Sequence, residues 1–164
     1  MQVLSSYLQQ ELPAGYANSI NGSIKKLDIK TFNLRPKNKN VLISITTSRI
    51  GTCSKKIKTE ETHSNIAVVK LKLKELGLLG KIQIDKVKFK GFEGYSYWYE
   101  NPDWVKYPNL GDGLYRYRME YKLWGKKVSL NIKIDYNEQN SKELNEAIEI
   151  VKTIEERKSS VLDS

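Results

Sequence analysis

Cysteine and histidine are nearly absent from this chain of 164 residues, which contains one of each, Cys53 and His63. A single cysteine excludes an intrachain disulfide and suits a reducing compartment. One histidine with one cysteine supplies too few ligands for a structural zinc site. The sequence also has no P-loop and no dinucleotide-binding glycine motif. It therefore predicts neither a metal site nor a bound cofactor.

Long apolar runs are missing as well. No stretch approaches the roughly 20 apolar residues of a membrane span. Residues 1–10 have neither the basic start nor the apolar centre of a signal peptide. We therefore expect a cytoplasmic protein without a membrane span.

Positive charge is in excess, because 28 Lys and Arg residues face 19 Asp and Glu residues, giving a net charge of +9. Such a surplus fits an anionic partner, such as nucleic acid, anionic lipid or an acidic protein. Lysines gather around the first predicted hairpin, although the aromatic residues lie elsewhere in the sequence. A solvated surface is the simpler interpretation, and single-stranded nucleic acid is the alternative. The candidate basic surface comprises Lys25, Lys26, Lys30, Lys37, Lys39, Arg116 and Arg118.

The strongest pattern runs from Gly113 to Tyr136, where apolar and polar residues alternate along two arms. A period of two predicts half-buried strands, so the stretch indicates an antiparallel hairpin. A two-residue type II′ turn at Gly125-Lys126, with positive φ at the glycine, would set the register. The expected apolar pairs are Leu123 with Val128, Tyr121 with Leu130, Met119 with Ile132, Tyr117 with Ile134, and Tyr115 with Tyr136. The other face, with Arg116 opposite Asp135 and Glu120 near Lys133, is predicted to be a charge-balanced solvent face.

The remaining elements complete a single domain over residues 1–157, followed by a flexible tail at 158–164. We expect a short helix or an edge segment in 1–12, turns in 14–23, a hairpin from 27–34 and 41–45, and a loop at 49–62. Ser64 is the expected cap of a helix that ends at Gly77 or Gly80, although residues 69–74 also alternate like a strand. A strand from residue 81, bulged near residues 85–86, then precedes a turn at 91–94, a strand at 95–99 and a loop at 100–112. Ser141 is the expected cap of the last helix, whose apolar stripe is Leu144, Ala147, Ile148, Val151 and Ile154. The predicted fold class is α+β, an antiparallel β-sheet with a mid-chain helix and a C-terminal helix packed against it.

Aromatic residues concentrate in the predicted strand at 95–99 and in the loop at 100–112. Tyr and Trp are common anchors of protein interfaces. The candidate partner-binding set is Tyr97, Trp98, Tyr99, Trp104 and Tyr107. The alternative is structural, with Tyr97 or Trp98 in the core and Trp104 holding the loop.

Two catalytic arrangements are weaker alternatives. Cys53 and His63 could form a nucleophile and a base, but they flank the predicted loop at 49–62, and a solvated thiol and a helix-start imidazole are favoured. Carboxylates near the aromatic residues could serve a hydrolase. These are Glu93, Glu100, Asp103 and Asp112.

The order of elements resembles the PsbP/DcrB-like fold family. The resemblance rests on Glu11–Tyr16, which is similar to the family's early Leu-Pro-x-Gly-aromatic step, on the strand-turn-strand Val87–Tyr95, and on the closing strand and helix at 129–154. Members of that family include photosystem accessory proteins, periplasmic lipoproteins and chaperones for secreted effectors. The resemblance implies a binding role and no catalytic residues. This chain lacks a lipid-attachment cysteine near its start, and the family does not predict its positive charge.

Together these patterns predict a small non-enzymatic protein that binds another protein, an acidic one in particular, as an adaptor, effector chaperone, immunity protein or inhibitor would. The alternative is a basic nucleic-acid-binding module.

Overall fold

The computed structural model describes most of the chain, with side chains from residue 40 onward except that of Arg49. The described residues are 2–3, 8–10, 16–24, 29–36, 40–49, 55–78, 82–107 and 114–156. Their elements are, in chain order, β1 (Gln2–Val3), β2 (Leu8–Gln10), β3 (Tyr16–Ile24), β4 (Ile29–Pro36), β5 (Val41–Arg49), α1 (Lys55–Glu75), β6 (Asp85–Phe89), β7 (Phe92–Glu100), α2 (Pro102–Lys106), β8 (Tyr117–Trp124), β9 (Val128–Tyr136), α3 (Lys142–Lys152) and β10 (Glu155–Glu156).

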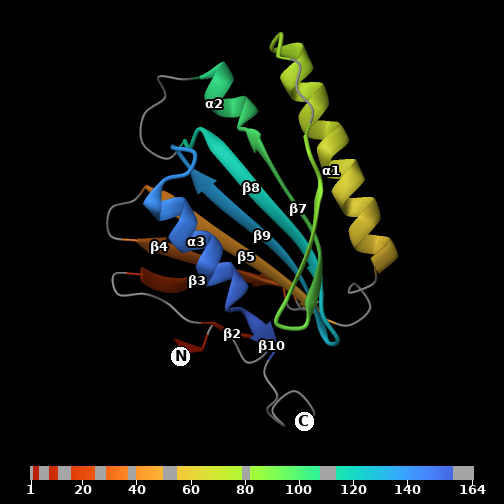
Figure 1. Ribbon diagram of the computed structural model, residues 1–164, viewed down its shortest axis with the longest axis vertical. Coiled ribbons are helices and arrows are strands. Elements are labelled where there is room, and N and C mark those ends of the chain that lie inside the picture. The colour runs from red at the N-terminus through yellow and green to blue at the C-terminus, as the bar shows by residue number, and fades with distance from the viewer. Residues whose placement is uncertain are drawn as a thin grey trace.

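Seven strands form one antiparallel sheet in the order β3-β4-β5-β9-β8-β7-β6, and β1, β2 and β10 form a small second sheet. Helix α3 packs across β5 and β9, whereas α1 packs against β7 and β8 (Figure 1). The predicted α+β class, with an antiparallel sheet and helices against it, is confirmed.

The predicted central hairpin is present as β8 and β9, but its register differs from the expected one by two residues. Leu123 pairs with Leu130, and Tyr121 pairs with Ile132. Met119 therefore faces Ile134 rather than Ile132, and Tyr117 rather than Tyr115 faces Tyr136. A shift of two keeps every side chain on its face of the sheet, so apolar residues still meet apolar partners.

The turn of this hairpin explains the shift. The Gly125 N–H donates to the Val128 carbonyl at 2.8 Å, so Lys126 and Lys127 occupy the turn. The described glycines with positive φ do not include Gly125, and the predicted type II′ turn is wrong. Glycine is required there for space, because a Cβ would lie 2.8 Å from the Phe92 ring and collide with the Glu156 carboxylate.

The main core lies between the sheet and α3. Alternate residues of β5 and β9 are fully buried there against one face of the helix. The Ser141 hydroxyl caps α3 by accepting from the Leu144 N–H at 3.2 Å, as predicted. The buried positions of α3 are Leu144, Ala147, Ile150 and Val151, so the expected apolar stripe omitted Ile150.

Helix α1 begins at Lys55, well before the predicted cap at Ser64, and residues 55–62 are helical rather than part of a loop. The apolar period missed this start because the buried residues of the first turns include Lys58 and Thr62. The helix ends as expected at Gly77, which adopts φ 77°. There the Leu78 N–H donates to the Leu73 carbonyl at 2.9 Å.

Several local predictions are corrected. Residues 16–24 form β3 rather than turns, and the described parts of 1–12 are the short strands β1 and β2. The expected loop at 100–112 contains α2, which Asn101 caps. Strand β6 starts only at Asp85 and pairs with β7 without a register shift, so no bulge forms.

The predictions for Cys53, Asp112 and the tail at 158–164 lie outside the described residues. Within the described part of the chain, no helix is long and apolar enough to cross a membrane.

Candidate functional site

The structure divides the predicted aromatic set between the two faces of the sheet. Tyr97 and Tyr99 are 2% and 7% exposed and pack with Ile66 and Val69 of α1. Trp98, which lies between them in β7, points to the other face and is 49% exposed. Successive residues of a strand alternate between faces, so these three side chains cannot form one surface. The five predicted residues are therefore not a single site.

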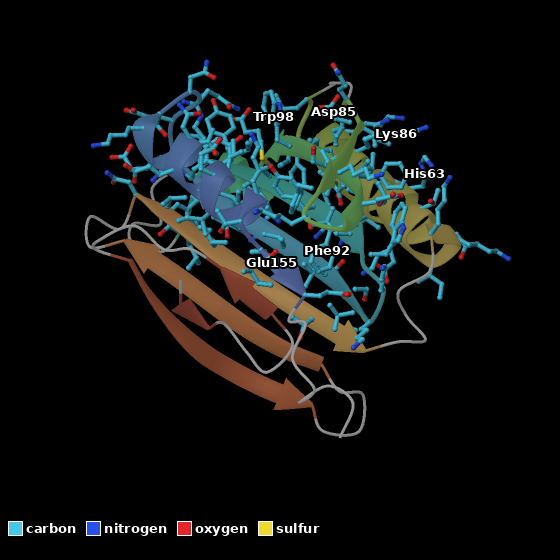
Figure 2. The ribbon with its side chains drawn as sticks, turned by 60° about the horizontal axis from the view of Figure 1, so that its bottom comes forward. His63, Asp85, Lys86, Phe92, Trp98 and Glu155 are labelled. Carbon is cyan, nitrogen blue, oxygen red and sulfur yellow. The ribbon has the colours of Figure 1, made fainter. Side chains whose placement is uncertain are left out.

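Trp98 belongs to a patch beside α3 that no described element covers fully. Its ring meets that of Tyr117 edge-on, with centroids 6.0 Å apart, and Tyr117 stacks on Tyr136 at 5.5 Å. Figure 2 shows Trp98 on this side of the molecule and His63 on α1. We call this patch the open sheet face. It consists of Trp98, the partly buried Met119 that pairs with it and Tyr117 that contacts its ring, with the partly buried Ile148 of α3 on the same side of the sheet.

Helix α2 places Trp104 at the edge of the open sheet face. The Arg116 guanidinium lies 5.1 Å from the ring centroids of both Trp104 and Tyr117. Its Nε also donates to Glu100 at 3.4 Å. Tyr107 is exposed, with the Lys106 ammonium 5.3 Å from its ring centroid. Arg116 thus contacts both the Trp104 ring of α2 and the Tyr117 ring of the sheet.

The predicted basic surface is not confirmed as one patch. Arg116 is exposed, but Arg118 points to the α1 side and donates to Asp135 at 2.7 and 3.3 Å. Burial alone would lower the pKa of Arg118, but the hydrogen bond and charge of Asp135 outweigh it and raise the pKa. Lys30 lies on β4, whose side chains are not described, and Lys25, Lys26, Lys37 and Lys39 lie outside the described residues.

The hairpin face that was expected to meet solvent is buried beneath α1. Glu120 is 1% exposed, and its partner across the hairpin is Lys133, while Arg118 rather than Arg116 pairs with Asp135. The prediction of a solvent face is wrong because α1 covers it with polar side chains of its own. We call this group the polar layer. Its buried members are Lys58, Thr62, Glu120, Lys122, Ser129 and Asp135.

Glu120 lies at the centre of the polar layer. Its Oε2 accepts from the Tyr99 hydroxyl and from the Asn65 amide, both at 2.6 Å. The same amide donates to the Tyr97 hydroxyl at 2.7 Å. Burial, followed by the charge of Glu120, raises the pKa of both tyrosines. The two phenols therefore stay protonated, and the Tyr99 hydroxyl holds the carboxylate in place.

Two buried lysines complete the polar layer. The Lys58 ammonium donates to Asn131 at 2.8 Å and to Glu61 at 3.0 Å. Lys122 lies 3.8 Å from Glu120, and burial lowers its pKa although the Glu120 charge acts in the opposite direction. A buried charge is costly unless it has an opposite charge or a hydrogen-bond partner. In the polar layer the buried lysines and carboxylates serve as such partners for one another.

A cavity of about 140 Å³ opens between the polar layer, α1 and α2. Two cations on its wall, Lys72 and Lys133, form no ion pair with the described residues, while Arg118 and Glu120 are already paired. The cavity could admit a few waters or a small anion. No group of three possible metal-ligating side chains occurs in the described ranges.

The carboxylates predicted as a hydrolase pair are separated. Glu93 and Glu100 stand near opposite ends of β7, where they bind Lys88 and Arg116 respectively. Asp103 belongs to the first turn of α2. His63 is exposed in the middle of α1. No sequence pattern singled out Glu120, Lys58 or Asn65, although Lys58 and Thr62 continue the helical spacing of Ile66 toward the start of α1.

The described residues define an α+β protein with a seven-stranded antiparallel sheet and a helix on each face. No family model and no curated protein matches the chain. A crystal structure of a protein from Bacteroides thetaiotaomicron VPI-5482 is similar over 93% of this chain, with a TM-score of 0.58 and 13% sequence identity. The chain spans 46% of that protein's length. Identity this low shows a shared fold and nothing of the activity.

Proposed function

We propose that this protein is a non-enzymatic binding protein that recognises another protein through the open sheet face. The half-exposed ring of Trp98 carries the proposal. A tryptophan on a strand, held edge-on by Tyr117, is already ordered before a partner arrives. Binding then costs little side-chain entropy and removes apolar surface from water.

The surroundings of Trp98 support a protein partner. Met119 pairs with Trp98 and is partly buried beside it, and Ile148 of α3 is partly buried on the same side of the sheet. Arg116 and Trp104 lie at the rim of this apolar area. Protein interfaces typically have aromatic and arginine anchors inside a more polar rim. The charged groups of the polar layer are bound to one another, which supports a structural role for them.

The net charge of +9 favours an acidic partner, because opposite charge accelerates encounter and disfavours wrong partners. An adaptor, effector chaperone, immunity protein or inhibitor would fit this description. The PsbP/DcrB-like resemblance implies the same kind of role and stays a prediction.

Quantitative affinity capture from an extract of the native host tests the proposal. Trp98→Glu places a charge in the open sheet face, so we expect the captured partner to be lost while the Tm stays close to that of the wild type. Leu71→Glu is the matched control, because Leu71 is 59% exposed but lies on α1. Equal capture by the two variants, with or without loss relative to wild type, would contradict the proposal.

A further inference from the structure

A second cavity lies on the α1 side of the sheet, where the first turn of α1 meets β6, β7 and β8. Its volume is about 250 Å³. Trp98 points to the opposite face, so this cavity is separate from the open sheet face. We call it the basic aromatic groove. Its lining residues are Lys55, Lys86, Val87, Lys88, Glu93, Gly94, Tyr95 and Trp124.

Two aromatic rings form one wall of the groove. Tyr95 and Trp124 come from neighbouring strands, and their ring centroids lie 5.9 Å apart at an interplanar angle of 58°. A hydrogen bond of 3.1 Å joins the Tyr95 hydroxyl to Thr59 of α1, which fixes that ring. Both residues are partly exposed. Fixed, partly exposed rings are suitable platforms for stacking a planar base.

Three lysines surround these rings. Lys88 pairs with Glu93 at 3.4 Å, but both side chains are largely exposed and the pair is weak. Lys55 and Lys86 are exposed and make no ion pair with the described residues. Figure 2 shows Lys86 beside α1. Further exposed lysines at the adjacent turns, Lys90 and Lys126, extend the positive charge.

We propose that the basic aromatic groove binds single-stranded nucleic acid, with a base against Trp124 and Tyr95 and phosphates on the lysines. Lys86 and Lys88 lie on β6 beside Tyr95 of β7, and the fold adds Lys55 from α1 and Trp124 from β8 to them. A single strand fits because an unpaired base can reach the rings, whereas stacked and paired bases in a duplex cannot. The net charge of +9 attracts a polyanion at long range.

Fluorescence anisotropy with labelled oligo-dT and oligo-U of about 12 nucleotides tests the proposal in the full chain. We expect binding at about 50 mM salt that weakens toward about 200 mM, with a log–log slope near −2 if three lysines contact phosphates. Comparison of oligo-dT with oligo-U shows whether the groove prefers DNA or RNA. Binding of either oligonucleotide supports the proposal. Failure of both oligonucleotides to bind at low salt would overturn it.

Charge-matched variants locate the binding. Lys55→Gln and Lys86→Gln are exposed substitutions that leave the fold intact, and each should weaken binding several-fold and reduce the slope by about 0.7. Lys142→Gln, on the exposed side of α3 beside Glu146, removes the same charge elsewhere and should have little effect. Equal losses in all three variants would show attraction by net charge alone and would overturn the groove.

Stacking has its own test. Trp124→Ala should weaken binding about ten-fold or more without changing the salt slope, because no phosphate contact is removed. If Trp124→Ala unfolds, tryptophan fluorescence of the wild type is measured instead while unlabelled oligo-dT is added. We expect the oligonucleotide to quench the fluorescence, and we expect the same quenching in Trp98→Phe. Stronger binding to a duplex of the same length would contradict the stacking. Trp98→Glu should bind the oligonucleotide normally, so this proposal and the proposed protein partner fail independently.

Discussion

Tyr97 and Trp98 are neighbours in the chain but lie in opposite environments, one beneath α1 and one at the surface. The alternation of β7 places them on different faces, and this much follows from the sequence. What covers each face does not follow, because arginine, glutamate and lysine alternate identically on a solvent face and beneath a helix. Glu120 was therefore assigned to solvent although it is among the most buried residues described.

Glu120→Ala should destabilise the protein by about 3 kcal/mol, because the substitution leaves the Tyr99 hydroxyl and the Asn65 amide without their acceptor and Lys122 without its counter-charge. Urea unfolding measures this free energy. Glu93→Ala, which removes a carboxylate from an exposed pair with Lys88, should cost about 0.5 kcal/mol or less. Similar losses in the two variants would mean that Glu120 does not hold the polar layer.

Alkaline pH should destabilise the fold, because buried tyrosines retain their protons. Burial raises the pKa of Tyr121 and Tyr136 to about 12, and burial with the Glu120 charge raises those of Tyr97 and Tyr99. The folded pKa exceeds the unfolded value of 10.0, so this stability is complete below pH 10 and is lost as the pH rises through the folded values.

Lys122 acts in the opposite direction. Its pKa is lowered from 10.5, so its unfavourable contribution is largest at low pH and disappears as the pH approaches 10.5. Between the unfolded tyrosine pKa of 10.0 and its own folded pKa, each buried tyrosine lowers the free energy of unfolding by about 1.4 kcal/mol per pH unit. Urea unfolding near pH 9 and pH 11, with tyrosinate absorbance of the native protein, measures the effect. Titration of all ten tyrosines near their ordinary pKa in the native state would contradict it.

At the scale of elements, the central hairpin was predictable because its apolar period extends over both arms. Its register was not, because the turn was inferred from the conformational freedom of Gly125, whereas the glycine is required by the nearby Phe92 ring and Glu156. The start of α1 was missed for a related reason. Lys58 and Thr62 occupy buried positions that a search for apolar periodicity counts as exposed.

Alanine substitutions at two glycines of the β6–β7 hairpin compare the cost of backbone strain with the cost of steric crowding. Gly91 has φ 84° and open space around it, so Gly91→Ala should cost about 1 kcal/mol. At Gly94 a Cβ would collide with the Lys122 carbonyl and lie 2.9 Å from the Leu123 Cα, so Gly94→Ala must separate β7 from β8. We expect a loss of at least about 3 kcal/mol. Equal midpoints in thermal unfolding would contradict this close approach of the two strands.

For the whole molecule, the sheet separates two kinds of chemistry. The α3 side carries the apolar core and, beyond the helix, the open sheet face, whereas the α1 side carries the polar layer. The sequence predicted the fold class and the presence of an aromatic surface residue. It could not identify which aromatic side chains remain exposed, because that depends on where α1 and α3 lie across the sheet.

Site-specific photocrosslinking tests the proposed use of the open sheet face most directly. A photoreactive phenylalanine analogue at position 98 should form a covalent adduct with the protein partner in the native host, because the ring lies at the proposed interface. The same analogue at position 63, exposed on α1, should form none with that partner. An adduct from position 63 and none from position 98 would place the partner on the opposite side of the molecule and contradict the account.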